Sequence, residues 1–323
     1  MATELAVDSA KSVATACLLC GQPLTLGSRS YFDTRFGSSG VYFITQCVGC
    51  GLEQTLPRPE PEQLRHLYES YYNFSGETGT SYTGLRERFL NSWLYRLWLA
   101  IDGDISFHSR RGRGDLLDYG CNEGRGLAIY KANGYRVEGL EWNSKAAELA
   151  RHRGFTVWNQ DLEDWHAPHL YDVIVLSNVL EHALDPARML ARIKTFLQPK
   201  GQLWISCPNN KSFLRQVFGR FWINWHVPFH ILHFSGHTLS KLLQKTGYLI
   251  IRVGNETPAL WFTQSMISRL FAKPGRPTRQ LRSVFYVLPL MIIARFILFP
   301  IFWLANHRSR GDCLILIAEN KQA

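Results

Sequence analysis

Several features are missing from this 323-residue sequence, and their absence narrows what the protein can be. The first residues, MATELAVDSAKSVATA, contain no charged start followed by an apolar run and a small-residue cleavage site. We therefore expect a cytoplasmic protein rather than a secreted one. Charged residues make up only 19% of the chain and hydrophobic residues 46%, which excludes global disorder and predicts a substantial core.

Acidic residues are absent between Thr257 and Arg310, although the same stretch holds eight basic residues. The whole chain has a net charge of +10, so most of its basic excess lies in this one segment. Such local asymmetry predicts a local anionic partner rather than a generally basic protein.

Four of the seven cysteines occur as two Cys-x-x-Cys-Gly pairs. Each pair turns two thiolates toward one centre, and four thiolates suit tetrahedral zinc. The alternative is two disulfides, which the lack of a secretion signal argues against. The residues between the pairs predict a short hairpin, and a complete set of four ligands predicts a structural metal that folds this small module. The ligands would be Cys17, Cys20, Cys47 and Cys50.

The stretch 115–126, DLLDYGCNEGRG, crowds three glycines and an asparagine directly after an apolar run. We read it as a strand, a flexible loop and the start of a helix, which is where open α/β sheets bind ligands. Its spacing is G-x-x-x-G-x-G, without the G-x-G-x-x-G fingerprint or the Gly-Lys-Ser/Thr of a phosphate loop. A nucleoside-type ligand without phosphate is the prediction.

Further strands and polar ends follow in order. Residues 135–141 predict a second strand that ends in Glu141, placed to accept hydrogen bonds from both ribose hydroxyls. Residues 144–154 predict a helix, 155–158 a third strand and 172–176 a fourth. Asp161, in an acidic loop, could accept a hydrogen bond from an adenine amino group.

The ordered segments LLDYGCNEGRG, VEGLEWN, QDLED, YDVIVLSNVLEHALDP and LQPKGQLWISCPN resemble the class I S-adenosylmethionine-dependent methyltransferases. The resemblance covers about residues 112–254 and a last strand at 313–319. It implies an α/β fold, a Rossmann-like doubly wound sheet with an antiparallel last strand, and S-adenosylmethionine as the cofactor. Asn122 departs from the family, which usually has glycine there, but asparagine tolerates the left-handed conformation.

The resemblance also implies the cofactor-binding residues. The first motif would wrap the methionine end and the ribose, Glu141 and Trp142 would lie beside ribose and adenine, and the later motifs would complete the site. The implied set is Asp118, Gly120, Cys121, Asn122, Gly124, Glu141, Trp142, Asp161, Leu162, Ser177 and Asn178.

The N-terminal part resembles a bacterial methyltransferase subgroup with a leading zinc ribbon, often linked to glycan or surface-polymer biosynthesis. We therefore predict a zinc ribbon at 1–58 and a helical linker or lid at 59–111. The methyltransferase domain would comprise 112–254 and 312–323. Residues 255–311 would form a basic hydrophobic insertion.

Two histidine-containing segments offer candidate catalytic residues. Glu181 and His182 follow the fourth strand, and the segment resembles quinone-biosynthesis O-methyltransferases, whose E-x-x-E-H motif can hold a divalent metal. Here Asn178 replaces the first carboxylate, which argues against a metal. In the second segment Pro228 predicts an extended loop, on which His226 and His230 point the same way. His230 is our candidate base or substrate orienter, whereas His233 is expected to be structural because Ser235 beside it caps a helix.

Residues 284–305 are apolar except for Arg295 and are long enough to cross a membrane. The predicted strands at 248–253 and 313–318 flank this segment and belong to one sheet, which excludes a single crossing. Pro289 and Pro300 are expected to break each half into a bent, shallow element. We predict peripheral or monotopic association with an anionic inner-membrane face through 257–310, with buried packing, a lid or a dimer surface as alternatives.

The favoured function is methyl transfer, O-directed, to a small-molecule, sugar or lipid-linked acceptor at the cytosolic membrane face. One alternative is an RNA methyltransferase that grips RNA with the zinc ribbon and the basic segment. Two features argue against a nucleic-acid substrate. The fourth motif reads Ser-Asn-Val-Leu, and long aliphatic runs separate the basic residues where an RNA-binding segment would offer side chains that stack on bases. The other alternative is a non-catalytic scaffold.

Overall fold

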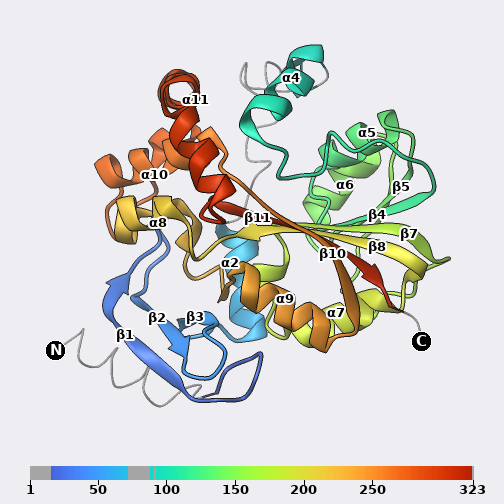
Figure 1. Ribbon diagram of the computed structural model, residues 1–323, viewed down its shortest axis with the longest axis horizontal. Helices are drawn as coiled ribbons and strands as arrows, with labels where there is room; N and C mark the ends of the chain where they lie inside the picture. The colour runs from blue at the N-terminus through green and yellow to red at the C-terminus, as the bar shows by residue number, and fades with distance from the viewer. Residues whose placement is uncertain (1–15, 72–87, 91, 322–323) are drawn as a thin grey trace.

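The computed structural model describes residues 16–71, 88–90 and 92–321. Figure 1 shows a large central sheet with helices on both faces and a smaller sheet beside it. The large sheet has seven strands in the order β10-β11-β8-β7-β4-β5-β6, and β11 runs antiparallel to both of its neighbours. Its strands are β4 (Asp115–Tyr119), β5 (Arg136–Leu140), β6 (Thr156–Trp158), β7 (Tyr171–Ser177), β8 (Leu197–Pro208), β10 (Tyr248–Glu256) and β11 (Cys313–Asn320).

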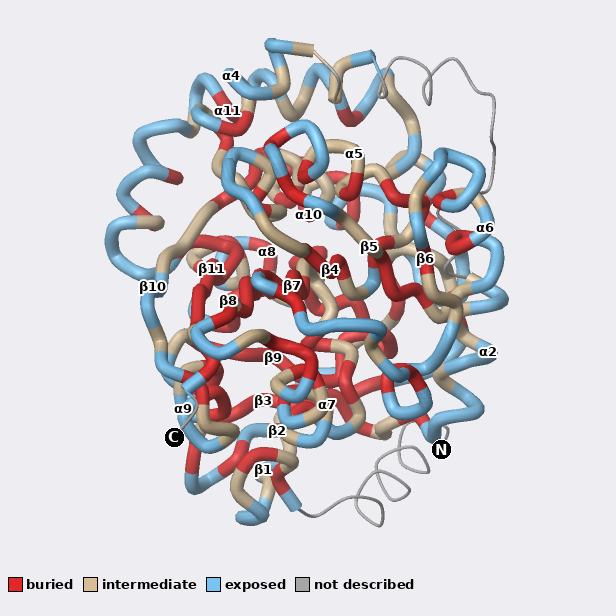
Figure 2. The backbone as a smooth tube through the Cα atoms, turned by 90° about the vertical axis from the view of Figure 1, so that its right-hand side faces the viewer, coloured by how far each residue is buried: buried red, intermediate tan, exposed pale blue. Residues whose placement is uncertain are grey.

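The central strands are buried on both faces because helices cover each side, as their nearly continuous apolar runs predict. Successive residues alternate between two cores: Leu117 faces one and Leu116 the other. Figure 2 shows these strands as buried tube in the middle of the molecule. The predicted α/β fold with an antiparallel last strand is therefore confirmed.

Four helices that cover the two faces of the large sheet each follow a strand in the chain. Helices α7 and α9 supply Leu190, Ile193 and Leu242 to the core on one face, and Tyr130 of α5 packs into the other. Asn143 and Asp185 cap the starts of α6 and α7 with their side chains, and Ser235 caps α9 as predicted. The bounds are α5 (Arg125–Ala132), α6 (Ser144–His152), α7 (Pro186–Lys194) and α9 (Gly236–Lys245).

The smaller sheet joins the N-terminal module to the main domain. Its order is β1-β2-β3-β9, and the pairing of Glu53 with His233 and of Gln54 with Leu232 links β3 to a strand from the far side of the sequence. The strands are β1 (Leu24–Tyr31), β2 (Tyr42–Cys47), β3 (Glu53–Leu56) and β9 (Leu232–His233). The predicted hairpin is present as β1 and β2, and the module shares one core with the main domain.

Two helices connect this module to the central sheet. Helix α2 (Pro61–Tyr71) lies in the predicted helical linker at 59–111 and has no fully buried residue. Part of this linker lies outside the described residues. After that part the chain forms a short helical piece at 88–90 and α4 (Trp93–Asp102).

The segment between β10 and β11 folds as two long helices on one flank of the sheet (Figure 1). They are α10 (Ala259–Phe271) and α11 (Val284–His307), joined through the 3-10 turn η4 (Arg279–Arg282). The expectation that Pro289 and Pro300 break the segment into two halves is wrong, because α11 is continuous through both. The remaining elements are α8 (Phe213–Phe218), η1 (Leu180–His182), η2 (Gly219–Phe221) and η3 (Ile223–Trp225).

Candidate functional site

The glycine-rich loop and the acid after β5 lie in direct contact. The backbone N–H of Asn122 donates to Glu141 Oε2 at 2.9 Å, and the N–H of Asn143 donates to Glu141 Oε1 at 2.9 Å. Gly120 and Asn122 both adopt positive φ, 77° and 50°, which turns the loop toward the carboxylate. Each carboxylate oxygen keeps a second lone pair, so Glu141 can still accept hydrogen bonds from ribose hydroxyls.

Asp118 lies at the end of β4 and is buried, with no hydrogen-bond partner for its carboxylate among the described residues. Burial, and next the negative charge of Glu141, raise its pKa to about 7. A Cβ atom on Gly126 would lie 3.0 Å from Asp118 Oδ2, so glycine leaves the space in front of this carboxylate open. Two buried acids with this open space fit a ligand that carries a positive charge, such as the methionine end of S-adenosylmethionine.

Trp142 follows Glu141 and is covered by Tyr68 of helix α2, with ring centroids 5.0 Å apart. The Tyr68 hydroxyl also lies 2.7 Å from His182 Nδ1, so one side chain joins the adenosine side of the site to the histidines described below. The side-chain N–H₂ of Asn159 donates to the carbonyls of Glu141 and Trp142 at 2.8 Å and fixes this strand end. Sequence reasoning missed both roles, since each depends on a contact between residues that are far apart in the chain.

Three implied cofactor residues make their side-chain contacts outside this centre. The side chain of Cys121 packs beneath Gly139 in a small core with Leu127 and Ala147, so only its backbone belongs to the loop. Leu162 is buried in the main core. Asp161 is half exposed, and its carboxylate lies 3.4 Å from a nitrogen of Arg65.

The fourth motif lies next to the loop. The turn after β7 packs closely against the glycine-rich loop, because a Cβ atom added to Gly120 would lie only 2.9 Å from Cγ2 of Val179. Asn178 has φ 56°, and its amide N–H₂ lies 3.5 Å from Ser177 Oγ. Ser177 Oγ in turn lies 3.4 Å from the carbonyl of Ile105, so the end of the linker also reaches this edge of the sheet.

Beyond this edge, three histidines and one glutamate form a buried cluster, here called the histidine cluster: Glu181, His182, His226 and His230. The ring centroid of His230 lies 4.7 Å from that of His182 and 4.8 Å from that of His226. Glu181 Oε1 lies 3.8 Å from His230 Nε2, and neither oxygen of Glu181 has a hydrogen-bond partner among the described residues. The two predicted histidine segments therefore meet at one site.

Hydrogen bonds fix the tautomer of the central ring. His230 Nδ1 lies 2.8 Å from the carbonyl oxygen of Asn224, which can only accept, so Nδ1 carries the proton and Nε2 keeps a lone pair. His182 Nδ1 lies 2.9 Å from the carbonyl of Phe229 and 2.7 Å from the Tyr68 hydroxyl, which can donate or accept, so its tautomer follows the direction of that hydroxyl proton. Of the two rings, His230 is therefore the one whose Nε2 is set to accept a proton.

Burial holds the cluster in its neutral form. Burial lowers the pKa of His182 to about 4, and Arg35 adds to this effect, while the pKa values of His226 and His230 also lie well below the usual range. Burial raises the pKa of Glu181 to about 8. Glu181, His182 and His230 are close enough to hold a metal ion.

The histidine loop is not extended as predicted. The backbone N–H of His230 donates to the carbonyl of His226 at 3.0 Å, which closes a turn around Pro228. The rings of His226 and His230 converge because of this turn, so the expected proximity holds for a different reason. His233 lies outside the cluster, with Nε2 at 2.9 Å from Thr55 Oγ1 and its ring against Trp225, which agrees with a structural role.

The four N-terminal cysteines form a second cluster of possible ligands. Sγ of Cys17 lies 3.6 Å from Sγ of Cys50, and Sγ of Cys20 lies 3.4 Å from Sγ of Cys47. Tetrahedral zinc with Zn–S bonds of about 2.3 Å requires S···S separations of about 3.8 Å. Burial acts to raise the pKa of Cys47, but hydrogen bonds from Cys50, Cys20 and Gly49 together lower it to about 6. The cluster fits a zinc ribbon.

Comparison with protein families places the chain. The family model described as Methyltransferase domain matches residues 82–253, more than half of the chain. The chain therefore belongs to this methyltransferase family, and its domain is that of an S-adenosylmethionine-dependent methyltransferase, as the five motifs predicted.

Curated relatives share part of this domain. The chain is 30% identical over 123 residues to the ubiquinone biosynthesis O-methyltransferase of Aeromonas salmonicida, which covers 35% of this chain and 52% of the relative. It is 30% identical over 145 residues to a probable S-adenosylmethionine-dependent methyltransferase of Mycolicibacterium smegmatis, which covers 44% and 54%. The chain thus spans about half the length of the curated relatives it matches.

Solved structures of similar fold are more distant in sequence. A methyltransferase from Thermotoga maritima, described as a possible histamine N-methyltransferase, has 18% identity and a TM-score of 0.45, covering 74% of this chain and 99% of that one. Magnesium protoporphyrin IX methyltransferase from Synechocystis, solved with bound S-adenosylhomocysteine, has 15% identity and a TM-score of 0.45, covering 81% and 100%.

Proposed function

We propose that this protein transfers a methyl group from S-adenosylmethionine to a hydroxyl oxygen of a small-molecule, sugar or lipid-linked acceptor at the cytosolic face of a membrane. The cofactor, when bound, supplies a methyl group activated by the sulfonium. Asp118 would hold its charged methionine end, Glu141 the ribose, and Trp142 the face of the adenine. The remaining task for the protein is to align the hydroxyl and remove its proton.

His230 is the proposed base. Its Nε2 keeps the lone pair while Asn224 holds Nδ1–H, and its neutral state at pH 7 follows from its burial. The proton of the acceptor hydroxyl would pass to Nε2 as the C–O bond forms and the C–S bond breaks. His182, His226 and Glu181 position this ring through contacts within the cluster.

The observation that carries the proposal is the meeting of this neutral histidine cluster with the turn after β7, since His182 follows Val179, which packs on Gly120 of the glycine-rich loop. Labelled methyl transfer from S-adenosylmethionine to a membrane extract of the source cell tests it. We expect an alkali-stable methyl ether in the product. A labelled amine, or label only in RNA with salt-sensitive RNA binding, would contradict the O-directed proposal.

Helix α11 supports the membrane location. It is the one helix within the described residues that is long and apolar enough to cross a membrane by length and composition. Its inner stripe, including Val287, Ala294 and Phe302, packs on the protein. The outer face exposes large apolar side chains, and Figure 2 shows much of the helix as exposed tube.

The single charge in α11 turns inward. Arg295 is buried, with Nη1 3.5 Å from Asp102 Oδ1, so the exposed face of the helix between residues 284 and 305 carries no charged side chain. Because β10 and β11 flank the insertion and are neighbours in the sheet, both ends of the insertion return to the same domain. These features favour a helix that lies in the plane of a membrane interface, with the exposed basic residues near both ends facing anionic head groups.

Flotation of the protein with lipid vesicles tests the proposal that α11 lies in the plane of a membrane interface. We expect binding that requires anionic lipid, and a loss of about tenfold or more for Phe296→Asp, whose side chain is 67% exposed. Leu249→Asp is the matched control, because Leu249 is 49% exposed on β10, outside α11. Equal loss in both variants, or equal binding to neutral vesicles, would contradict an in-plane anchor.

Zinc is the proposed occupant of the cysteine cluster, in a structural role. All four ligands come from the protein, which leaves no open position for a substrate. Two sulfurs accept hydrogen bonds from backbone N–H groups: Cys17 from Leu19 at 3.4 Å and Cys47 from Gly49 at 3.3 Å. Such donors stabilise a metal-bound thiolate.

A further inference from the structure

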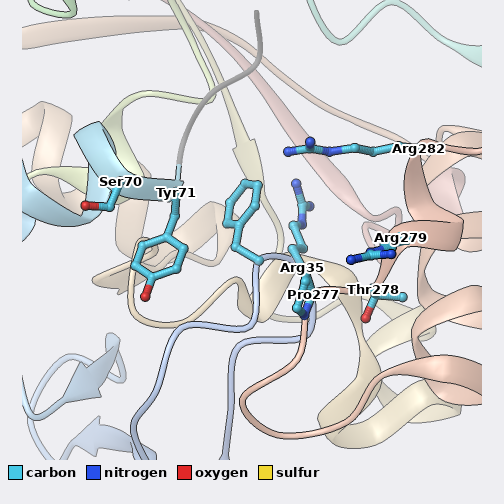
Figure 3. A pocket seen from close by; sticks show the side chains of 8 residues that line it. Arg35, Ser70, Tyr71, Pro277, Thr278, Arg279 and Arg282 are labelled. Carbon is cyan, nitrogen blue, oxygen red and sulfur yellow. The ribbon is translucent and has the colours of Figure 1, made fainter. Parts of the chain in front are cut away.

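A pocket of about 380 Å³ lies where the N-terminal module meets the insertion, and we call it the arginine pocket. Its lining comes from three separate parts of the chain: the loop after β1, the end of α2, and the turn before α11. The lining residues are Arg35, Phe36, Ser70, Tyr71, Pro277, Thr278, Arg279 and Arg282. Figure 3 shows the side chains of Arg35, Arg279 and Arg282 gathered on one side, across from Tyr71.

The chemistry of this lining favours an anion. Three guanidinium groups face the pocket, and no acidic residue lines it among the described residues. Arg279 and Arg282 have no carboxylate within ion-pair distance in the described parts of the chain. A pair of guanidinium groups such as those of Arg279 and Arg282 is typical of phosphate recognition, because each offers a fork of N–H donors to phosphate oxygens.

Thr278 adds a polar residue to the lining of the pocket. Thr278 is only 4% exposed, and its Oγ1 has no hydrogen-bond partner among the described residues. A buried hydroxyl without a partner costs free energy unless a ligand or water satisfies it. The backbone N–H of Thr278 donates to the carbonyl of Arg35 at 3.0 Å, so this hydroxyl and the arginines are held on one rigid junction.

The arginine pocket also adjoins the histidine cluster. The ring of Phe36, which lines the pocket, lies 5.5 Å from His226 and 5.4 Å from Phe229 by centroid distance. The charge of Arg35 contributes to the lowered pKa values of His182, His226 and His230, as expected for a cation close to all three. The pocket is therefore separated from His226 of the histidine cluster by one side chain, that of Phe36.

We propose that the arginine pocket binds a phosphate or pyrophosphate ester carried by the methyl acceptor, and so sets the class of substrate. This inference rests on the proposed function, since it names the acceptor of the same reaction. Arg279, Arg282 and Thr278 hold the phosphate oxygens, and the hydroxyl to be methylated extends past Phe36 toward His230. Helix α11 begins directly after this turn, at Val284, so an apolar chain on the same ester has the exposed face of α11 beside it.

Calorimetric titration of the full chain with inorganic pyrophosphate tests the pocket. We expect binding at one site, and a loss of about tenfold or more in the double variant Arg279→Gln/Arg282→Gln. The matched control is Arg308→Gln/Arg310→Gln, which removes the same charge from exposed residues at the other end of α11. No binding by the wild-type chain, or equal weakening in both double variants, would overturn the proposal.

Two competitors then identify the source of the phosphate. Displacement of pyrophosphate by a soluble nucleoside-diphosphate sugar indicates a soluble ester. Displacement by phosphatidylcholine vesicles with phosphatidic acid, but not by pure phosphatidylcholine vesicles, indicates a lipid-borne ester. Displacement by neither would overturn the proposal, because the site would then hold only an adventitious anion.

Failure of this inference and failure of the proposed function give different results. Titration with S-adenosylhomocysteine reports the cofactor site, which shares no residue with the arginine pocket, and both double variants are expected to bind it as the wild-type chain does. A wild-type chain that binds S-adenosylhomocysteine but not pyrophosphate rejects only the arginine pocket. Pyrophosphate binding without S-adenosylhomocysteine binding rejects the methyltransferase function instead.

Discussion

At the scale of single residues, the site depends on buried groups whose charge differs from what their type suggests. Asp118 and Glu181 have raised pKa values, and the clustered histidines have lowered ones, because burial penalises each charged form. Residues that combine such shifts with mutual contact are strong candidates for function. The motifs predicted these residue types in sequence, but only the fold determines that Glu181 and His230 face each other.

His230→Gln is expected to lower kcat/KM by about 10²–10⁴-fold, because the proposed base is lost. His233→Gln, on the same loop, is the control and should lower thermal stability while leaving kcat within about threefold, since His233 contacts Thr55 and Trp225. Labelled methyl transfer measures both variants. Similar kcat losses in the two would contradict the assignment of His230.

The pH profile tests the same residue without a substitution. A base works only when neutral, and the histidine pKa values are lowered, that of His182 to about 4. The value of kcat at saturating S-adenosylmethionine, which removes the effect of Asp118 on cofactor binding, should therefore stay level as the pH falls from 7 to about 5.5 and decline only below that. An acid limb with an apparent pKa near 6.5 would indicate an ordinary exposed histidine and contradict the buried, neutral cluster.

At the scale of elements, the sequence predicted the sheet well and the insertion poorly. Strands such as 115–119 and 171–177 are short apolar runs between polar ends. This local pattern alone is enough to predict a buried strand. Helix α11 contains two prolines, each unfavourable by about 3 kcal/mol in a helix interior. Packing of its inner stripe on the protein offsets this cost, which local sequence cannot reveal.

Arg295→Met tests the account of α11. The substitution leaves Asp102 buried without its ion-pair partner, which should lower the free energy of unfolding by about 3–5 kcal/mol at pH 8. Burial already raises the pKa of Asp102 to about 6, so the folded state binds its proton more tightly than the unfolded state does. Stability of the variant should therefore recover as the pH falls from 8 toward 4.

Urea unfolding at pH 8 and pH 5 measures this effect, and Arg308→Met serves as control, because Arg308 is exposed at the end of the helix. An Arg295→Met chain that unfolds like the control at both pH values would show that α11 is not held through Asp102. In that case its single charge would face outward, against the proposed in-plane anchor.

At the scale of the whole molecule, the N-terminal module with the cysteine cluster packs as part of the methyltransferase domain. The hydroxyl of Thr55, on β3, donates a hydrogen bond to the carbonyl oxygen of His230 at 2.7 Å. The backbone N–H of Thr55 donates to the carbonyl oxygen of Ile231 at 2.9 Å. The Nζ of Lys245 donates to the carbonyl of Leu19 at 2.8 Å. The motifs predicted the ribbon and the domain separately, but contacts between residues more than 170 positions apart lie beyond sequence patterns.

Cys47→Ser should therefore disturb catalysis more than cofactor binding. Loss of one thiolate removes the zinc and loosens β3, which supports the histidine loop, so methyl transfer is expected to fall at least about tenfold. The affinity for S-adenosylhomocysteine should change less than about threefold. Val48→Ser is the control in the same turn, since Val48 is exposed and is no ligand.

Zinc content, calorimetry and labelled transfer report the three effects. A Cys47→Ser chain that keeps full transfer activity after losing its metal would show that the ribbon is an independent appendage. A wild-type chain without zinc would contradict the assignment of the cysteine cluster.

Titration calorimetry with S-adenosylhomocysteine tests most directly whether the loop after β4 and the acid after β5 form a nucleoside site. We predict that the wild-type chain binds one equivalent, that Glu141→Ala weakens binding by about 100-fold, and that Glu148→Ala, an exposed acid on α6, has no effect. No binding by the wild-type chain, or equal binding by the Glu141 and Glu148 variants, would contradict the account.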